Sequence, residues 1–301
     1  MRIVFLGTPD FSVSCLDALI NSKHEILAVV TQPDKARNRN MQVSFSPVKE
    51  EALKHNIKVL QYDKIRLQGV QDLKDLNPDI MVTCAYGQII SQEILDIPKY
   101  GVINVHASLL PKYRGSAPIQ WAILNGEKET GITIMQTALG VDSGDIILQE
   151  KVQIKPHETA GELFDDLAKI APSVLLKAMD QIENGTATFT KQNEEESTHF
   201  PMLTKEDGHI NWEDNGDKII NKIFGLNPWP SAYSILDGKV FKIFDADFEK
   251  ADVENVGIIK DCKVSCKDGY IVLKDVQIEG KKRMNVNDFV RGCSIDGKEL
   301  K

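Results

Sequence analysis

A short stretch in the middle of the chain holds polar side chains of the types that acyl-group chemistry uses. Asn104 and His106 stand two residues apart in a strand-like run, Val102 to His106, so their side chains point to the same face of a sheet. Asp142 stands in the small-residue turn Gly140 to Asp145, directly before another expected strand. An amide that donates to a developing oxyanion, beside groups that accept a proton, suits direct transfer to an incoming amine without a covalent intermediate. The alternative is an asparagine and a histidine satisfied within a loop-packing network.

The elements around these residues predict an α/β domain. Apolar runs typical of buried strands alternate with stretches of helical periodicity. The expected strands are 2–6, 26–31, 57–59, 80–84, 102–106, 131–135 and 145–148, and the expected helices are 11–20, 48–55, 70–76, 118–125 and 159–184. This alternation predicts a doubly wound, Rossmann-like, mostly parallel sheet with its ligands at the carboxyl ends of the strands. The first strand is followed by Gly7 to Phe11, which lacks the further glycines of a dinucleotide site.

The second part of the chain reads differently. We expect a catalytic domain over residues 1–189, a polar linker over 190–207 and a second domain over 208–301. After a helix at Gly216 to Phe224, short strand-like runs are separated by glycine and aspartate turns. These runs are 232–236, 240–244, 257–259, 263–266, 270–273 and 276–278. The pattern predicts a small OB-like β-barrel.

Composition narrows the function classes. The 301 residues are 42% hydrophobic and 27% charged, which is typical of a globular protein able to build sizeable cores. No apolar run reaches the ~18 residues of a membrane span, so a cytoplasmic protein without a membrane partner is expected. The five cysteines are scattered and form no metal-binding spacing, so no metal is expected. Because the net charge is -8, any nucleic-acid binding must depend on local basic patches.

Several motifs resemble those of the methionyl-tRNA formyltransferases. They are GTPDF (7–11), TQPD (31–34), SPVK (46–49), AYG (85–87), the run NVHASLLPKYRGSAPIQWAI from Asn104, GVDSGD (140–145), NPWP (227–230) and GKKRM (280–284). The resemblance covers nearly the whole chain. SLLPKYRG alone indicates only the wider group of formyltetrahydrofolate-using enzymes, and the continuation to NPWP narrows the group to the tRNA enzymes.

The resemblance implies a reaction and roles for three residues. The enzyme would transfer a formyl group from 10-formyltetrahydrofolate to the α-amino group of methionyl-initiator tRNA, for translation initiation. Asn104, His106 and Asp142 match the catalytic residues of the family. Asn104 and His106 would stabilise the formyl oxygen as it becomes an oxyanion. Asp142 would orient His106, favour its charged form and take the proton of the amine, through water.

The resemblance also implies where the folate co-substrate binds. Ala85, Tyr86 and Gly87, together with Leu139, Gly140 and Val141, match loops that contact the pterin through exposed backbone groups. Ser108, Leu109, Leu110 and Pro111 would form a wall of the same site, and the same four residues could equally be an ordinary turn with buried leucines. Spacing alone leaves the segments 85–87 and 139–141 as loops that could equally be structural or functional.

Two basic segments are expected to bind tRNA. The loop from Pro33 to Pro47 carries Lys35, Arg37 and Arg39, and Arg39 aligns with a functional arginine of the family. Met41 and Gln42 stand where relatives often carry lysines, which predicts fewer phosphate contacts and a shallower salt dependence. The second segment is the cluster Lys281, Lys282 and Arg283 on the expected barrel. Without the resemblance, both segments read as solvated surface.

Two other functions remain open from the sequence. One is a formyltransferase acting on a small nucleotide-linked amine, which would not need the Arg39 loop or a basic barrel face. The other is a non-catalytic folate-binding or tRNA-binding module, which would not need Asn104, His106 and Asp142. A monomer is expected, while affinities and the preference for methionine lie beyond what the sequence predicts.

Overall fold

The structure is a computed structural model that describes residues 1–36 and 43–301. It divides into two compact units. The first unit comprises Met1–Gly115, Gly131–Val152 and Phe164–His199, and the second comprises Ser116–Thr130, Gln153–Leu163 and Phe200–Lys301. Two segments of the expected catalytic domain, Ser116–Thr130 and Gln153–Leu163, thus group with the second unit. The domain boundaries expected at residues 189 and 207 stay a prediction.

The first unit is built on a seven-stranded sheet with the strand order β10-β9-β7-β6-β1-β2-β5. Its members are β1 (Arg2–Gly7), β2 (Glu25–Thr31), β5 (Val59–Gln61), β6 (Ile80–Cys84), β7 (Val102–His106), β9 (Glu129–Gln136) and β10 (Ile146–Gln153). The five strands from β7 to β5 run parallel, and β9 pairs antiparallel with β7. The predicted mostly parallel sheet is therefore confirmed.

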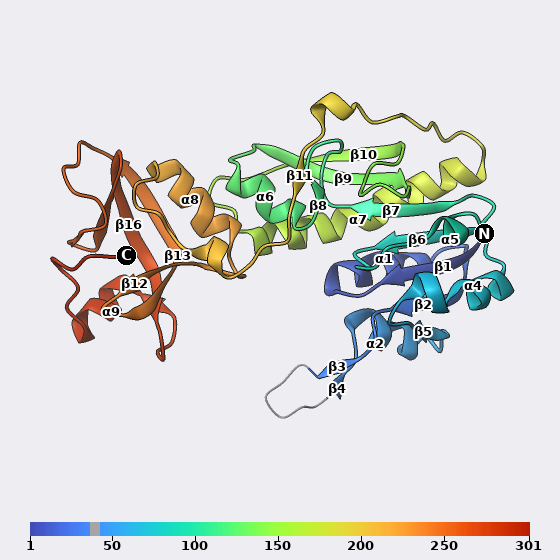
Figure 1. Ribbon diagram of the computed structural model, residues 1–301, viewed down its shortest axis with the longest axis horizontal. Helices are drawn as coiled ribbons and strands as arrows, with labels where there is room; N and C mark the ends of the chain where they lie inside the picture. The colour runs from blue at the N-terminus through green and yellow to red at the C-terminus, as the bar shows by residue number, and fades with distance from the viewer. Residues whose placement is uncertain (37–42) are drawn as a thin grey trace. The chain divides into compact units, whose positions relative to one another are not determined.

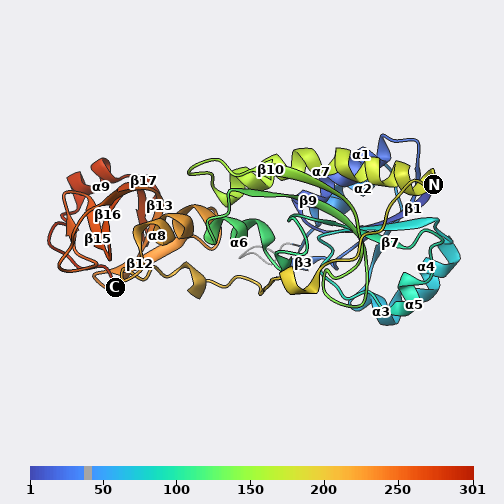
Figure 2. The same cartoon turned by 90° about the horizontal axis from the view of Figure 1, so that it is seen from above.

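Helices cover both faces of this sheet. Figures 1 and 2 show α1 (Asp10–Ile20), α2 (Pro47–Lys54) and α7 (Ala160–Glu183) on one face, and α3 (Ile65–Gln68), α4 (Val70–Leu76) and α5 (Gln92–Leu95) on the other. Consecutive residues of β1, from Ile3 to Leu6, are all fully buried. Burial of neighbouring residues is expected where helices pack on both faces of a parallel strand. Val4 of β1 belongs to one core cluster with Leu73 of α4 and Ile94 of α5.

Residues 190–199, part of the expected linker, run back over the first unit. The segment contains the short helix η1 (Glu194–Glu196) and begins the strand β11 (His199–Phe200), which pairs with β8 (Arg114–Gly115). The amide of Arg114 donates to the carbonyl of Thr198 at 2.8 Å. The polar composition of the segment gave no sign of this attachment. A further short helix, η2 (Glu206–Gly208), lies in the second unit.

The second unit contains an antiparallel sheet with the order β12-β13-β16-β15-β14, to which β17 adds beside β16. Its elements are β12 (Ala232–Leu236), β13 (Lys239–Lys250), β14 (Ile259–Lys260), β15 (Lys263–Cys266), β16 (Gly269–Ile278), β17 (Met284–Asn285), α6 (Pro118–Leu124), α8 (Gly216–Gly225) and α9 (Val286–Gly292). The segment 298–301 joins the two ends of the sheet. Leu300 donates to the carbonyl of Gly257 beside β14, and Lys301 exchanges two backbone hydrogen bonds with Ile235 of β12. The expected small β domain is therefore confirmed as an antiparallel sheet joined end to end.

One strand prediction in this unit is wrong. The runs 270–273 and 276–278 were expected to be separate strands, but they form the single strand β16. Lys274 does not interrupt the strand because its ammonium group pairs across the sheet with Asp247 at 2.7 Å. Asp275 likewise pairs with Arg283 at 2.8 Å. Opposite charges on neighbouring strands therefore stabilise the strand at the point where polarity alone indicated a turn.

The short strands β3 (Lys35–Ala36) and β4 (Val43–Ser44) pair antiparallel in the first unit. Arg37, Arg39, Met41 and Gln42 lie outside the described residues. Across 1–36 and 43–301, the structure contains no helix with the length and apolarity that a membrane crossing requires.

Candidate active site

Asn104 and Thr83 face each other on neighbouring strands. They are paired in the register of β6 and β7, and the hydroxyl of Thr83 donates to Oδ1 of Asn104 at 2.8 Å. Because the amide oxygen is engaged, the Nδ2 group is directed away from Thr83. Within the described part of the chain, Nδ2 has no protein partner. Asn104 therefore offers a free donor at the carboxyl end of the sheet, and Thr83 holds it there.

His106 is nearly buried, with 7% of its surface exposed. Its Nε2 atom lies 2.8 Å from the carbonyl oxygen of Tyr113. A carbonyl oxygen can only accept, so Nε2 must carry a proton, and Nδ1 is the ring atom whose protonation can change. Nδ1 lies 3.7 Å from Oδ2 of Asp142. This distance is too long for a direct hydrogen bond, so the orienting contact comes from Tyr113 and Asp142 acts on the ring through charge.

Asp142 occupies a tightly held turn. Its φ of 47° is left-handed, a conformation that aspartate tolerates better than most residues. Its Oδ2 accepts from the amide of Gly115 at 2.8 Å. A side chain at Gly144 would place its Cβ 1.7 Å from the carbonyl oxygen of Gln136, so only glycine fits there. The fold thus brings the predicted residues Asn104, His106 and Asp142 to one edge, with the carboxylate fixed near the imidazole.

The predicted folate loops expose backbone and leave one aromatic side chain inside. Ala85 and Gly87 are exposed and have positive φ angles of 47° and 80°. Tyr86 between them is 4% exposed and packs in the core, and burial raises the pKa of its hydroxyl well above the usual range. Leu139 and Val141 are 65% and 63% exposed. The second loop therefore presents apolar side chains to solvent, as a site for a flat ring requires.

The turn Ser108 to Pro111 is satisfied internally. Ser108 donates to the carbonyl of Lys112 at 2.8 Å, and Leu110 is buried. The side chain of Gln149 donates to the carbonyl of Leu110 at 2.9 Å. These contacts explain the turn as a structural element, and its role as a wall of the folate site stays a prediction.

A hollow adjoins the start of β7 in the first unit. It is lined by Gln92, Leu95, Asp96, Gly101, Val102, Gln136, Thr137, Ala138 and Leu139. Val102 is two residues before Asn104 on the same strand, so the hollow lies on the face to which Asn104 points. Leu139 is the one residue of the predicted folate loops that lines it. Sequence reasoning missed the other lining residues, because α5 and its neighbours carry no chemical motif.

A polar network holds the base of the loop that carries Lys35, Arg37 and Arg39. Lys49 pairs with Asp34 and donates to Oε1 of Gln61 at 2.9 Å. Burial works against the ionisation of Asp34, but the bonds from Lys49 and Gln61 outweigh it and hold the pKa of this carboxyl below its usual range. The TQPD and SPVK motifs thus meet in space. Only backbone is described for Lys35, so the site role of this loop stays a prediction.

The basic cluster in the second unit is only partly free. Arg283 donates through Nε and Nη2 to Oδ2 of Asp275 and lies 4.6 Å above the ring of Phe244. Lys281 and Lys282 are exposed. Two of the three predicted phosphate contacts therefore have unobstructed side chains, while Arg283 would have to leave Asp275.

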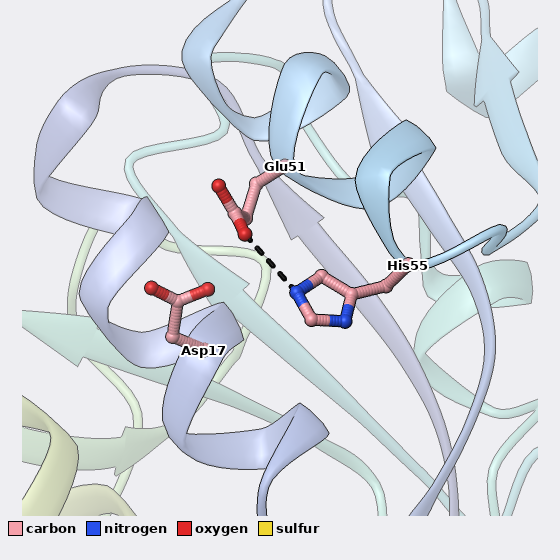
Figure 3. Close-up of side chains that lie close together, drawn as sticks. All are labelled: Asp17, Glu51 and His55. Atoms are coloured by element: carbon pink, nitrogen blue, oxygen red, sulfur yellow. Dashed lines mark hydrogen bonds and ion pairs between the residues drawn. The ribbon is translucent and has the colours of Figure 1, made fainter.

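Two clusters of potential metal ligands occur among the described residues, both away from Asn104 and His106. One comprises His24, Asp180 and Glu183, and Figure 3 shows the other, Asp17, Glu51 and His55 between α1 and α2. In the second cluster, the Nε2 atom of His55 lies 3.2 Å from Glu51, and Lys54 already neutralises the same carboxylate at 2.7 Å. Burial, with a smaller contribution from Glu51, raises the pKa of Asp17 above its ordinary 3.8.

We predict that Asp17→Asn stabilises the protein at neutral pH. A carboxyl whose pKa is raised by folding is costly to ionise in the native state, so this cost is present at pH 7. It disappears below about pH 3, where the carboxyl is protonated in both states. Because Asp17 is partly exposed, the gain should be below about 1 kcal/mol. Urea unfolding at pH 7 and pH 3 measures it, and an equal gain at both values would contradict the electrostatic explanation.

Comparison with known families shows the class of enzyme to which the chain belongs. Residues 1–179 match the model of the formyl transferase family, and residues 202–294 match the model of the formyl transferase C-terminal domain. An N-formyltransferase from Helicobacter canadensis, solved with folinic acid and dTDP-3-aminofucose, shares the fold. The TM-score is 0.71 at 21% identity, over 94% of this chain and all of that one. The chain is thus a formyl transferase by its family and its fold.

Relatives with high sequence identity then identify the family within the formyl transferases. The chain is 48% identical to a methionyl-tRNA formyltransferase of Agathobacter rectalis, over 98% of each chain. It is 46% identical to the methionyl-tRNA formyltransferase of Alkaliphilus oremlandii over the same shares. The chain belongs to the methionyl-tRNA formyltransferase family.

Proposed function

We propose that the protein transfers a formyl group from 10-formyltetrahydrofolate to the α-amino group of methionyl-initiator tRNA. The observation that carries the proposal is the site itself: Asn104 offers a free amide donor beside the imidazole of His106, whose Nδ1 lies 3.7 Å from Asp142. A donor for an oxyanion and a nearby carboxylate are the two groups that transfer to an amine needs. Membership of the family gives the substrates.

The side chains divide the work of the transfer step. The amine nitrogen attacks the formyl carbon, whose oxygen gains negative charge within reach of Asn104 Nδ2 and the imidazole of His106. One proton of the amine passes through a water to Asp142, whose Oδ2 lies 3.7 Å from Nδ1 of His106. The bond from the formyl carbon to N10 of the folate then breaks, and N10 takes the proton that Asp142 received, which returns Asp142 to its carboxylate form. Fixed contacts from Thr83, Tyr113 and Gly115 hold the three groups in place before the substrates arrive.

The folate is expected to bind on the face of β7 that carries Asn104. Support comes from the hollow beside Val102 and from the exposed apolar side chains of Leu139 and Val141. Exposed backbone at Ala85 and Gly87 can pair with a flat, amide-like ring, while the side chain of Tyr86 is excluded because it is buried. The wall formed by Ser108, Leu109, Leu110 and Pro111 would lie on the opposite side of His106.

The tRNA-binding proposal depends on Lys35, Arg37 and Arg39 in one loop and on Lys281, Lys282 and Arg283 in the second unit. We predict that Arg39→Ala raises KM for initiator methionyl-tRNA more than it lowers kcat at saturating tRNA. An arginine that contacts tRNA phosphate and takes no part in the chemistry affects binding alone. Steady-state formylation at two salt concentrations measures both parameters, with Arg291→Ala on exposed α9 as the control. A fall in kcat at unchanged KM would contradict a binding role.

A direct assay separates the proposed function from its alternatives. Formyl transfer from a labelled folate donor should occur with initiator methionyl-tRNA and be much weaker with elongator methionyl-tRNA. Transfer to a nucleotide-linked amine without tRNA would favour the small-molecule formyltransferase. Binding of folate or tRNA without transfer would indicate a non-catalytic module. A cytoplasmic, monomeric protein that needs no metal is part of the same proposal.

A further inference from the structure

Arg114 is a fully buried arginine at the end of the SLLPKYRG motif, with 2% of its surface exposed. All three nitrogens of its guanidinium group bond to the segment after α7. Nη1 and Nη2 donate to the two carboxylate oxygens of Glu194 at 2.9 and 2.8 Å, and Nε donates to Oε1 of Gln192 at 3.0 Å. Arg114 thus binds this segment through a bidentate pair and a further bond, the strongest geometry available to an arginine.

Gln192 connects Arg114 to the loop that carries Asp142. Its Nε2 group donates to the carbonyl oxygens of Asp142 and Gly144, at 2.8 and 2.7 Å. These two bonds use both hydrogens of the side-chain amide, while Oε1 accepts from Arg114. Both polar atoms of the Gln192 side chain are therefore engaged. The two shorter bonds from Nε2 hold the turn that carries the carboxylate, and a longer contact joins Nε2 to the sulfur of Met135 at 3.9 Å.

The same segment, residues 192–198, also contacts the backbone at Tyr113, next to His106. The hydroxyl of Thr198 accepts from the amide of Tyr113 at 2.8 Å, and the carbonyl of Tyr113 is the group that orients His106. Residues 192–198 therefore contact the backbone beside both His106 and Asp142. All of these contacts lie within the first compact unit.

We propose that Gln192 is a positioning residue for the formyl-transfer reaction, which holds Asp142 at its working distance from His106 and is itself held by Arg114 and Glu194. This inference rests on the proposed function. Asp142 has a left-handed φ of 47°, which is unfavourable for a residue with a side chain, so contacts from outside the turn, such as those of Gln192, help to hold it. Misplacement of a reacting group by about 1 Å can cost about a hundredfold in rate, which is why a residue without contact to substrate can affect kcat.

Gln192→Glu tests the proposal with almost no change of shape. The new carboxylate keeps an acceptor for Arg114 but replaces the donor to Asp142 and Gly144 with an acceptor. A merely structural role through Arg114 would survive this change, whereas positioning of Asp142 would not. We expect kcat to fall about 10- to 100-fold, with KM for both substrates within about threefold of the original. Gln192→Met is the second variant, for use if Gln192→Glu folds poorly. Methionine has a similar length and no charge, cannot donate to Asp142 or Gly144, and should lower kcat by the same order.

Asn21→Asp is the matched control. Asn21 also donates its side-chain amide to a backbone carbonyl, that of Asp17 at 2.9 Å, but at the end of α1 and away from the site. The substitution makes the same change from donor to acceptor. It should leave kcat unchanged within about twofold, which separates loss of positioning from the general cost of placing a carboxylate against a carbonyl.

The decisive comparison repeats Gln192→Glu in a protein that already carries Asp142→Asn, in single-turnover assays. If Gln192 acts through the Asp142 carboxylate, its loss should cost less than about twofold there, because coupled residues are not additive. An equal loss in both backgrounds would overturn the proposal, and so would a kcat within threefold of the original in both Gln192 variants.

A second readout does not depend on activity. The amide of Gly115 donates to Asp142, so its hydrogen exchange should quicken at least tenfold in Gln192→Glu. Unchanged exchange would overturn the positioning role. The unmodified protein could fail to formylate methionyl-tRNA while Gln192→Glu still quickens exchange at the Gly115 amide. In that case the proposed function would be wrong, but Gln192 would still position Asp142.

Discussion

Asn104→Ala and His106→Ala are each expected to lower kcat for formyl transfer about 100- to 1000-fold, the usual cost of removing one oxyanion donor. Asn104 has an amide N–H group that makes no hydrogen bond to the described residues, and we propose that it donates to the reacting carbonyl. His106 contributes an imidazole whose orientation is already fixed by Tyr113. Both donors act on charge that exists only in the transition state, so KM for methionyl-tRNA should change little.

Single-turnover rates with saturating enzyme measure this loss without interference from product release. Thr83→Val gives a graded test, because it leaves the Asn104 amide in place but removes the hydroxyl that holds its oxygen. We expect an intermediate loss of about tenfold. His55→Ala, at an exposed histidine directly after α2, should retain the full rate. Rates near the original in Asn104→Ala or His106→Ala would mean that neither side chain contacts the reacting carbonyl.

The residues that could be predicted from the sequence are those whose side chains we propose for the chemistry. The spacing of Asn104 and His106 places them on one face of a strand, and the small-residue turn around Asp142 precedes the next strand. Period-two alternation and the topology of a parallel sheet are sufficient to bring such residues to one edge. The fold class follows from the same local patterns, which is why the sheet and the second unit agree with expectation.

The residues that hold this site could not be predicted in the same way. Tyr113 orients His106 through its backbone carbonyl, a group that every residue carries, so its identity gives no signal. Gln192 stands in a polar stretch whose composition is typical of a linker, and its contacts with Asp142 and Arg114 are made across long separations in the chain. Tyr86 shows the reverse case, because an aromatic residue in a predicted ligand loop turns inward to the core.

One residue of the SLLPKYRG motif, Arg114, bears on whether its contacts with Gln192 and Glu194 could have been predicted. Arg114 lies in the motif SLLPKYRG beside several apolar residues, and an arginine that is buried requires acidic or amide partners to be stable. The longest run of acidic residues in the chain is Glu194 to Glu196. Composition could therefore have suggested a partner, but three glutamates at one place gave no way to choose Glu194, which only the fold brings to the guanidinium group.

Asp142→Asn is expected to lower kcat about 100- to 10,000-fold, the range for loss of a general base. This loss is at least as large as the loss expected for Asn104→Ala or His106→Ala. The substitution is nearly isosteric, and asparagine also tolerates the left-handed φ of 47° at this position. Its side-chain oxygen can still accept from the amide of Gly115, so the turn should keep its shape. What disappears is the group that takes the amine proton beside His106.

Asp142→Ala separates the chemistry from the geometry. Alanine removes the carboxylate and the bond to Gly115, and it is less favourable in a left-handed turn. If proton acceptance is the main role, the two variants should lose kcat to within about threefold of each other, while alanine alone quickens hydrogen exchange at Gly115. If asparagine restored most of the rate that alanine loses, Asp142 would serve to shape the turn, and the proton would have to leave the amine directly to water.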